Sequence, residues 1–81
     1  MKASEIEKTL RDELRRIAPD IEIDDIDQGA ELREEFDIDS MDFLTLVTAL
    51  GKRLKLKMPE ADYPKMMSFS DMLGYLQNKA G

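Results

Sequence analysis

One serine stands among three aspartates in the stretch FDIDSMDFL, residues 36–44. A serine hydroxyl becomes a nucleophile only when a base activates it. The neighbouring carboxylates of Asp39 and Asp42 are normally ionised and are poorly matched to that task. The chain also contains no histidine that could complete a catalytic triad. We therefore expect no catalytic residue here, but the hydroxyl of Ser40 remains able to accept a group that another enzyme delivers.

The composition excludes several kinds of catalytic and metal-binding site. The 81 residues include no cysteine, so the protein itself supplies no thiol, no disulfide and no thiolate metal ligand. The lack of histidine removes the commonest general base and the commonest metal ligand. The length predicts a single domain over residues 1–81, whose core is too small to leave much room for a deep catalytic cavity.

The formal net charge is −6, from 18 acidic and 12 basic residues. Binding of nucleic acid or of an anionic membrane surface needs a concentrated basic surface, so this charge argues against both. No apolar run approaches the roughly 20 residues that span a bilayer, and the N-terminal MKASEIEK lacks the apolar core of a signal peptide. We expect a soluble, cytoplasmic, monomeric protein.

The charges are unevenly distributed along the chain. Residues 20–42 hold eleven acidic side chains and one basic side chain, Arg33. Residues 43–58 hold four basic side chains and no acidic one. Negative potential should therefore concentrate around Ser40.

Helix capping offers one simple explanation of the aspartates. Asp39 or Ser40 can cap a helix, and Asp37 and Asp42 complement its dipole. Capping does not require the long acidic loop, and it does not explain Met41, which lies off the predicted core face and should face solvent.

Calcium binding is a second explanation. Asp37-x-Asp39 resembles the opening of an EF-hand loop, but Asp42 stands where glycine makes the turn and Thr48 where a bidentate glutamate belongs. A loop that starts at Asp25 fails at the same two positions. We therefore expect no metal site of this type, although the acidic loop allows loose cation binding.

The first helix should span residues 4–17. Ser4 and Glu7 fit a capping box, and Pro19 ends the helix. A long connection follows, which we expect to be an ordered loop with a short turn over residues 32–36; loops this long in compact domains are often functional. The side chains expected to bury these two segments are Ile6, Leu10, Leu14, Ile17, Ile21, Ile23, Ile26, Leu32 and Phe36.

The second helix should run from residue 39 or 40 to about residue 55. Residues 60–66 allow at most a short helix, because Pro64 tolerates only a first-turn position. The last helix should start near Ser68, with Asp71 as its capping partner. Its buried face, and that of the second helix, should be Phe43, Leu46, Val47, Leu50, Leu54, Phe69, Met72, Leu73 and Leu76. The pattern predicts a small all-α four-helix bundle, with three main helices and one short one.

The triplet Asp39-Ser40-Met41, within LREEFDIDSMDFLTLVTAL, resembles the Asp-Ser-Leu motif of acyl carrier proteins. The resemblance extends over nearly the whole chain, through the long acidic loop and the segment MPEADYPKMMSFSDMLGYL. In that family the motif serine receives 4′-phosphopantetheine from coenzyme A through a phosphopantetheinyl transferase. The resemblance therefore implies a non-catalytic carrier that holds acyl groups as thioesters on an arm at Ser40. Such an arm supplies the thiol that the chain lacks.

The resemblance also implies partner enzymes, namely acyl-activating enzymes, acyltransferases or synthases of fatty-acid or related lipid and secondary-metabolite biosynthesis. The residues implied in their recognition are Asp37, Asp39, Met41 and Asp42. A bound acyl chain could lie against Phe43, Leu46, Val47 and Leu50, for which the simpler interpretation is that they form the core.

The chain departs from the family pattern in the second helix. Carriers that feed fatty-acid synthesis typically have acids along it, whereas this chain has Thr45, Gly51, Lys52 and Arg53. We therefore expect a specialised carrier. The same motif serves peptidyl and aminoacyl carriers, including those loaded with D-alanine. An unmodified acidic helical adaptor that binds cations is a further alternative.

Overall fold

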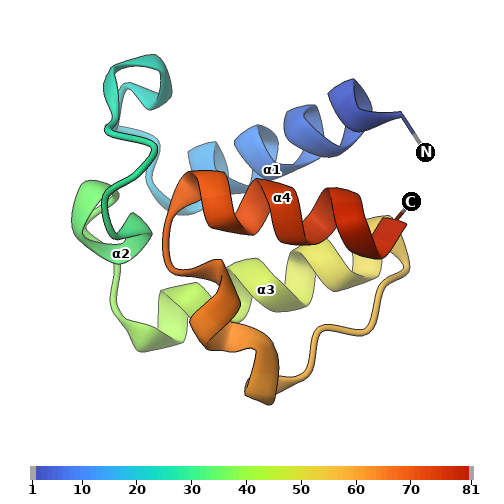
Figure 1. Cartoon of the computed structure of the whole chain (residues 1–81). Coiled ribbons are helices and arrows are strands. Elements are labelled where there is room, and N and C mark those ends of the chain that lie inside the picture. The colour runs from blue at the N-terminus through green and yellow to red at the C-terminus, as the bar shows by residue number, and fades with distance from the viewer. Residues whose placement is uncertain (1, 81) are drawn as a thin grey trace.

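Three longer helices form a bundle in the computed structural model, which describes residues 2–80. They are α1 (Ala3–Ile17), α3 (Ser40–Leu54) and α4 (Phe69–Ala80). A short helix, α2 (Leu32–Glu35), and two 3₁₀ helices, η1 (Ile23–Asp25) and η2 (Glu60–Met66), complete the fold. α1 packs against α3 and α4, and η2 packs against α4. Figure 1 shows α2 and the long loop together at one end of the molecule, away from both termini. The predicted all-α four-helix bundle is confirmed.

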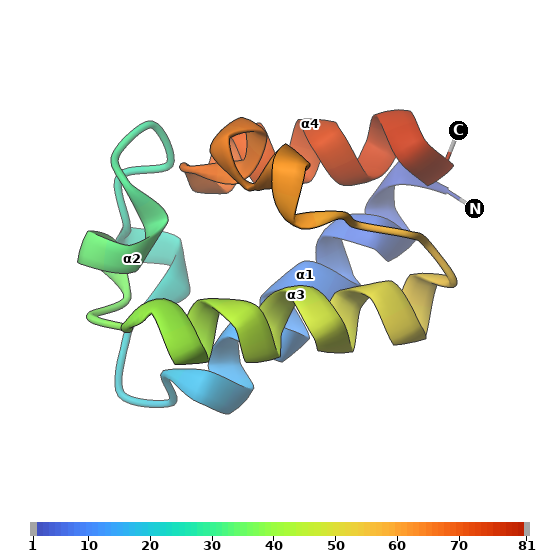
Figure 2. The ribbon, with the colours of Figure 1, turned by 90° about the horizontal axis from the view of Figure 1, so that it is seen from below.

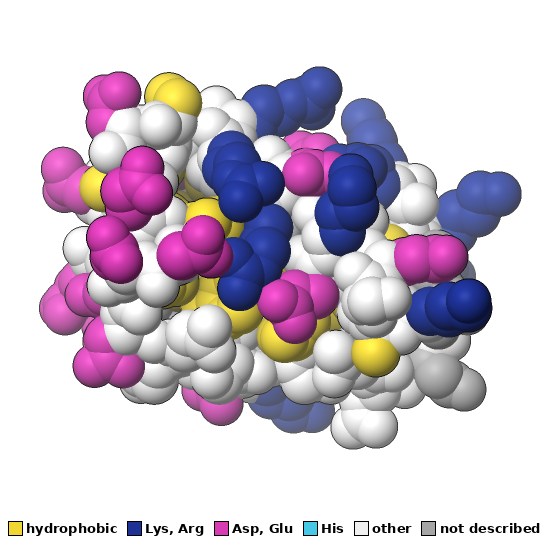
Figure 3. Space-filling model, turned by 90° about the horizontal axis from the view of Figure 1, so that it is seen from above, with side chains coloured by type: hydrophobic (Ala, Val, Ile, Leu, Met, Phe, Trp, Pro, Cys, Tyr) yellow, Lys and Arg dark blue, Asp and Glu magenta, His cyan; other side chains and the backbone are white. Residues whose placement is uncertain are grey.

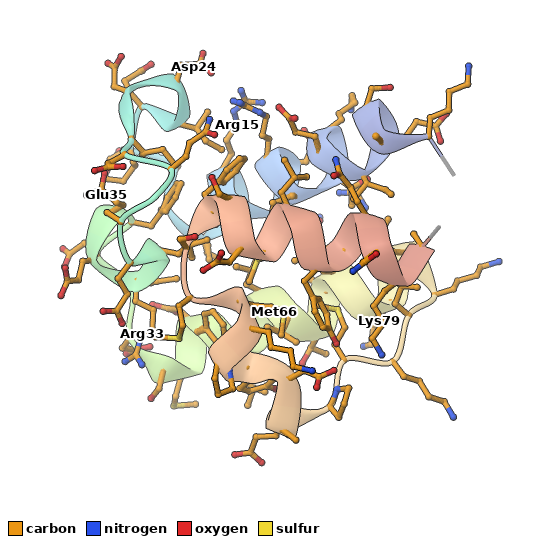
Figure 4. The ribbon with its side chains drawn as sticks, in the orientation of Figure 1. Arg15, Asp24, Arg33, Glu35, Met66 and Lys79 are labelled. Atoms are coloured by element: carbon orange, nitrogen blue, oxygen red, sulfur yellow. The ribbon has the colours of Figure 1, made fainter. Side chains whose placement is uncertain are left out.

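The core consists of the apolar faces that the helical spacing predicts. Ile17 and Leu73 are only half-buried at its edge. Met66, in η2, is fully buried although no periodic pattern indicated it (Figure 4). The predicted residues of the three longer helices that are buried are Ile6, Leu10, Leu14, Phe43, Leu46, Val47, Leu50, Leu54, Phe69, Met72 and Leu76.

Two local predictions are wrong. α1 begins one residue early, and the carbonyl of Lys2 accepts the amides of Glu5 and Ile6 without any side-chain cap. Ser4 therefore lies inside the first turn, where its hydroxyl cannot take the cap position of a capping box. Pro64 lies well inside η2 rather than in its first turn. The backbone angle that proline imposes suits a 3₁₀ helix, and only one hydrogen bond is lost there.

The long connection between α1 and α3 is ordered, as predicted. Its side chains Ile23, Leu32 and Phe36 are buried, and Ile21 and Ile26 are half-buried against the core. Backbone hydrogen bonds add a second anchor, because residues 28–32 of the loop pair with residues 67–70. The amide of residue 32 donates to the carbonyl of residue 67 at 2.7 Å, and that of residue 70 donates to the carbonyl of residue 28 at 3.0 Å.

The start of α4 follows the prediction. The hydroxyl of Ser68 accepts the amide of Asp71 at 3.0 Å, and Ser68 is buried. The cap therefore lies beside the hydrogen bonds that join the loop to this segment.

A charged pair with one buried partner, Glu13, connects α1 to α3. Glu13 is 4% exposed, and its carboxylate accepts a hydrogen bond of 2.8 Å from Arg53. Arg16 lies 3.6 Å from the same carboxylate. The sequence pattern did not indicate this burial, because an acidic residue in a charged helix is normally assigned to the solvent face.

Tyr75 of α4 donates a hydrogen bond of 2.5 Å to the carboxylate of Asp62 in η2. Burial, followed by this hydrogen bond, raises the pKa of Tyr75 to about 12. The same bond lowers the pKa of Asp62, and the nearby ammonium groups of Lys65 and Lys79 act in the same direction. The bond therefore fixes the position of η2 relative to α4.

The pH dependence of stability tests this bond. The contribution of Tyr75 is complete below its ordinary pKa of 10.0 and is lost as the pH rises through about 12. That of Asp62 is complete above its ordinary pKa of 3.8 and is lost as the pH falls through its lowered value in the folded protein. We expect Tyr75→Phe to lower the Tm most between these limits, with the difference from the wild type shrinking at both extremes. A difference that stays constant with pH would contradict the assignment; Tyr63→Phe serves as the control.

Candidate functional site

Ser40 is the first residue of α3, and it is exposed. The helix is capped by the preceding residue, because the carboxylate of Asp39 accepts the amide of Asp42 at 2.9 Å. The carbonyl of Asp39 accepts the amide of Phe43 at 3.0 Å. Of the two caps that the sequence allowed, the structure therefore uses Asp39. The hydroxyl of Ser40 is left accessible at the positive end of the helix dipole.

The segment between α2 and α3 has a fixed conformation. Asp37 has a φ of 51°, in the left-handed region that aspartate tolerates better than most residues. The amide of Ile38 donates to the carbonyl of Arg33 at 3.0 Å, and that of Asp37 donates to the carbonyl of Glu34 at 3.3 Å. This pair of bonds is the Schellman arrangement that ends a helix. It ties α2 to Ile38, which lies two residues before Ser40.

A hollow of about 630 Å³ opens beside Ser40. Its walls come from α2, from the first turns of α3, from η2 and from the residue that follows η2. Figure 2 shows α2 next to the N-terminal end of α3. The lining residues are Arg33, Ser40, Met41, Phe43, Leu44, Glu60, Tyr63, Pro64 and Met67.

The lining of this hollow is mostly apolar. Met41, Leu44 and Met67, which are 75%, 49% and 41% exposed, are the exposed large apolar side chains in the described part of the chain, and all three line it. The prediction that Met41 faces solvent is confirmed. Leu44 and Met67 were not singled out from the sequence, although Leu44 lies one helical turn after Met41, outside the core positions of α3.

The four residues suggested for an acyl pocket have core positions in this conformation. Leu46 and Leu50 are 1% and 0% exposed, and Val47 is 3% exposed. Phe43 is the member of this group that lines the hollow, and its ring packs edge-on against Tyr63 at 5.5 Å between centroids. Their role in holding an acyl chain stays a prediction.

Acidic side chains surround the start of α3. Asp37, Asp39 and Asp42 are all exposed. Figure 3 shows Asp and Glu side chains gathered at the end of the molecule that holds the long loop, whereas Lys and Arg side chains lie over the middle and the opposite end. This distribution agrees with the uneven charge of the sequence.

Residues 2–80 contain no group of three or more Asp, Glu, His or Cys side chains placed to hold a metal ion. In the same residues, every helix is too short or too polar to cross a membrane.

Comparisons with known proteins show which family this sequence matches. A family model described as a phosphopantetheine attachment site matches residues 5–76. The acyl carrier proteins of Campylobacter jejuni (strain RM1221) and Campylobacter lari (strain RM2100) are each 26% identical to this chain over 58 residues. Each alignment covers 72% of this chain and 75% of the relative.

The residues around Ser40 fit a phosphopantetheine group. An accessible hydroxyl at a helix N-terminus suits a phosphodiester, because the free amides and the dipole favour an anion there. The apolar hollow beside the hydroxyl suits the less polar remainder of an arm.

The division of roles between Asp39 and Ser40 can be tested by unfolding in urea. We expect Asp39→Ala to lower the free energy of unfolding by about 0.5–2 kcal/mol, the usual cost of a lost cap. Ser40→Ala should change it by less, because this hydroxyl makes no hydrogen bond within residues 2–80. Equal losses in the two variants would show that Ser40 shares the capping role.

Proposed function

Because the chain belongs to the phosphopantetheine-binding family of acyl carrier proteins, we propose that Ser40 is the residue that carries its covalent 4′-phosphopantetheine. The observation that supports this most directly is the position of Ser40, exposed at the N-terminus of α3 while Asp39 caps the helix. An exposed serine with an unused hydroxyl is what a modifying enzyme requires. The protein is then a carrier and not an enzyme.

In the modification, the Ser40 oxygen forms a bond to the phosphorus that bears the pantetheine of coenzyme A. The bond from this phosphorus to the bridging oxygen of the pyrophosphate breaks, and adenosine 3′,5′-bisphosphate leaves. The serine proton passes to a base of the phosphopantetheinyl transferase, because the protein has no histidine to receive it. When bound, the arm supplies the thiol that holds acyl groups as thioesters.

Intact mass measures this modification. Incubation with coenzyme A, magnesium and a phosphopantetheinyl transferase should add one phosphopantetheinyl group to the wild type and none to Ser40→Ala. Ser70→Ala, which removes another exposed hydroxyl, is the matched control and should be modified fully. An unmodified wild type would favour the cation-binding adaptor, which a calcium titration of the unmodified protein then tests.

The face of α3 that continues from Ser40 supports a specialised partner. Beyond the exposed apolar Met41 and Leu44, this face carries Thr45, Thr48 and then Lys52, all exposed. A partner enzyme with basic groups near its active-site entrance fits Asp37, Asp39 and Asp42. The same enzyme needs a neutral or acidic surface opposite Lys52, because like charges in an interface oppose binding.

We assign the protein to acyl transfer in the cytoplasm, with a dedicated acyl-activating enzyme or acyltransferase as its partner. Fatty-acid synthesis or a related lipid or secondary-metabolite route uses such carriers. Because the arm holds the cargo, peptidyl or aminoacyl groups such as D-alanine are the alternative cargo.

Reversing the charge of Lys52 tests this partner assignment. We expect Lys52→Glu to raise the KM of the acyl-loading enzymes encoded beside the carrier by about two- to five-fold, the range for an exposed charge pair. The same change should lower the KM of general fatty-acid enzymes. Lys8→Glu makes the same charge change on α1, where Lys8 is exposed, and should affect neither set. Better turnover of the wild type with the general enzymes would count against specialisation.

A further inference from the structure

Arg33 is the one basic residue among the eleven acids of residues 20–42, and its side chain is exposed. The other four arginines, at positions 11, 15, 16 and 53, each lie within ion-pair distance of a carboxylate. Arg33 forms no ion pair and no side-chain hydrogen bond with any residue from 2 to 80. Although many acids lie near it in the sequence, the Arg33 side chain is therefore available to bind an anion from outside the chain.

The backbone fixes Arg33 relative to Ser40. The carbonyl of Arg33 accepts the amide of Ile38 at 3.0 Å, and Ile38 is buried two residues before Ser40. Arg33 and Ser40 line the same hollow. In Figure 4 the Arg33 side chain extends from α2 toward the first turn of α3, whereas Glu35 of the same helix lies on the far side of α2.

We propose that Arg33 is a positioning residue, whose guanidinium binds the phosphodiester formed on Ser40. This inference rests on the proposed attachment at Ser40. A guanidinium offers two parallel N–H donors that match two phosphate oxygens. The second charged residue of the hollow, Glu60, carries the wrong sign for this role, so Arg33 is the cation of the lining.

The surroundings of Ser40 explain why such a cation matters. Asp39 and Asp42 place two carboxylates close to the position of the phosphate, and like charges repel. The helix dipole offsets this repulsion only in part. A guanidinium on the α2 side compensates the remaining charge and draws the phosphate toward α2. The arm then starts at one rim of the hollow and extends across Met41 and Met67, which lie in its lining.

NMR of Arg33→Gln, with Arg15→Gln as the matched control, tests this. Arg15 is 55% exposed and lies on α1, outside the hollow. Each protein is prepared unmodified and fully modified, as intact mass verifies, with methionine methyl groups labelled. Modification should shift the methyl signals of Met41 and Met67 in the wild type and in Arg15→Gln. In Arg33→Gln these shifts should fall about two- to five-fold, as expected for an exposed charge pair.

A second measurement, on the wild type, does not depend on the variants. The Nε–H signal of Arg33 should move on modification and should return toward its original position in about 1 M salt, where screening acts over about 3 Å. Arg33→Lys keeps the positive charge but lacks the two parallel N–H donors, and it should give intermediate methyl shifts. This variant decides the question if the unmodified Arg33→Gln spectrum shows a disturbed fold.

The outcomes separate the two proposals. Full modification with equal methyl shifts in the wild type and both arginine variants overturns the role of Arg33 and leaves Ser40 as the attachment site. Absence of added mass on the wild type overturns both proposals. Reduced shifts in Arg33→Gln alone, with an unmodified spectrum like that of the wild type, support the positioning role.

Discussion

A hydrogen bond of 2.7 Å from the amide of Leu32 to the carbonyl of Met67 joins the two segments that enclose the start of α3. Leu32 opens α2 and is buried, and Met67 follows directly after η2. Without this bond the start of α2 would lose its direct backbone link to the residue that follows η2. The hollow beside Ser40 exists because both walls are fixed to each other while the first turn of α3 stays exposed between them.

Two different requirements meet at the first turn of α3. A helix needs a cap for its first amides, and the modification proposed at Ser40 needs a hydroxyl without intramolecular partners. The chain separates these tasks between adjacent residues, since Asp39 caps and Ser40 does not. The sharp turn at Asp37 then brings α2 close without covering the serine. An exposed hydroxyl is thus obtained without a frayed helix.

The sequence predicted the elements that depend on periodicity, namely the three longer helices and most of their buried faces. It also singled out Ser40 as a candidate site through the resemblance of Asp39-Ser40-Met41 to the carrier motif, and the structure places Ser40 exposed at the start of α3. It did not predict the burial of Glu13, which depends on the position of Arg53, forty residues away in the sequence. The walls of the hollow were missed for the same reason, because Arg33, Tyr63 and Met67 are brought together only by tertiary contacts. The failed capping box at Ser4 shows the reverse case, in which a local motif was present and the helix began one residue earlier.

The net charge of −6 describes this surface poorly, because a partner senses charge over short distances. Ser40 and Lys52 lie twelve residues apart on one helix, which corresponds to roughly 18 Å along its axis. Screening in cells acts over about 8 Å, so the acids around Ser40 and the base at Lys52 act as two separate patches. A partner that matched only the acidic end would gain little from the rest of α3, and one with a uniformly basic surface would be repelled at Lys52. We therefore expect the order of charges along this helix, rather than their sum, to determine which partner enzymes bind it.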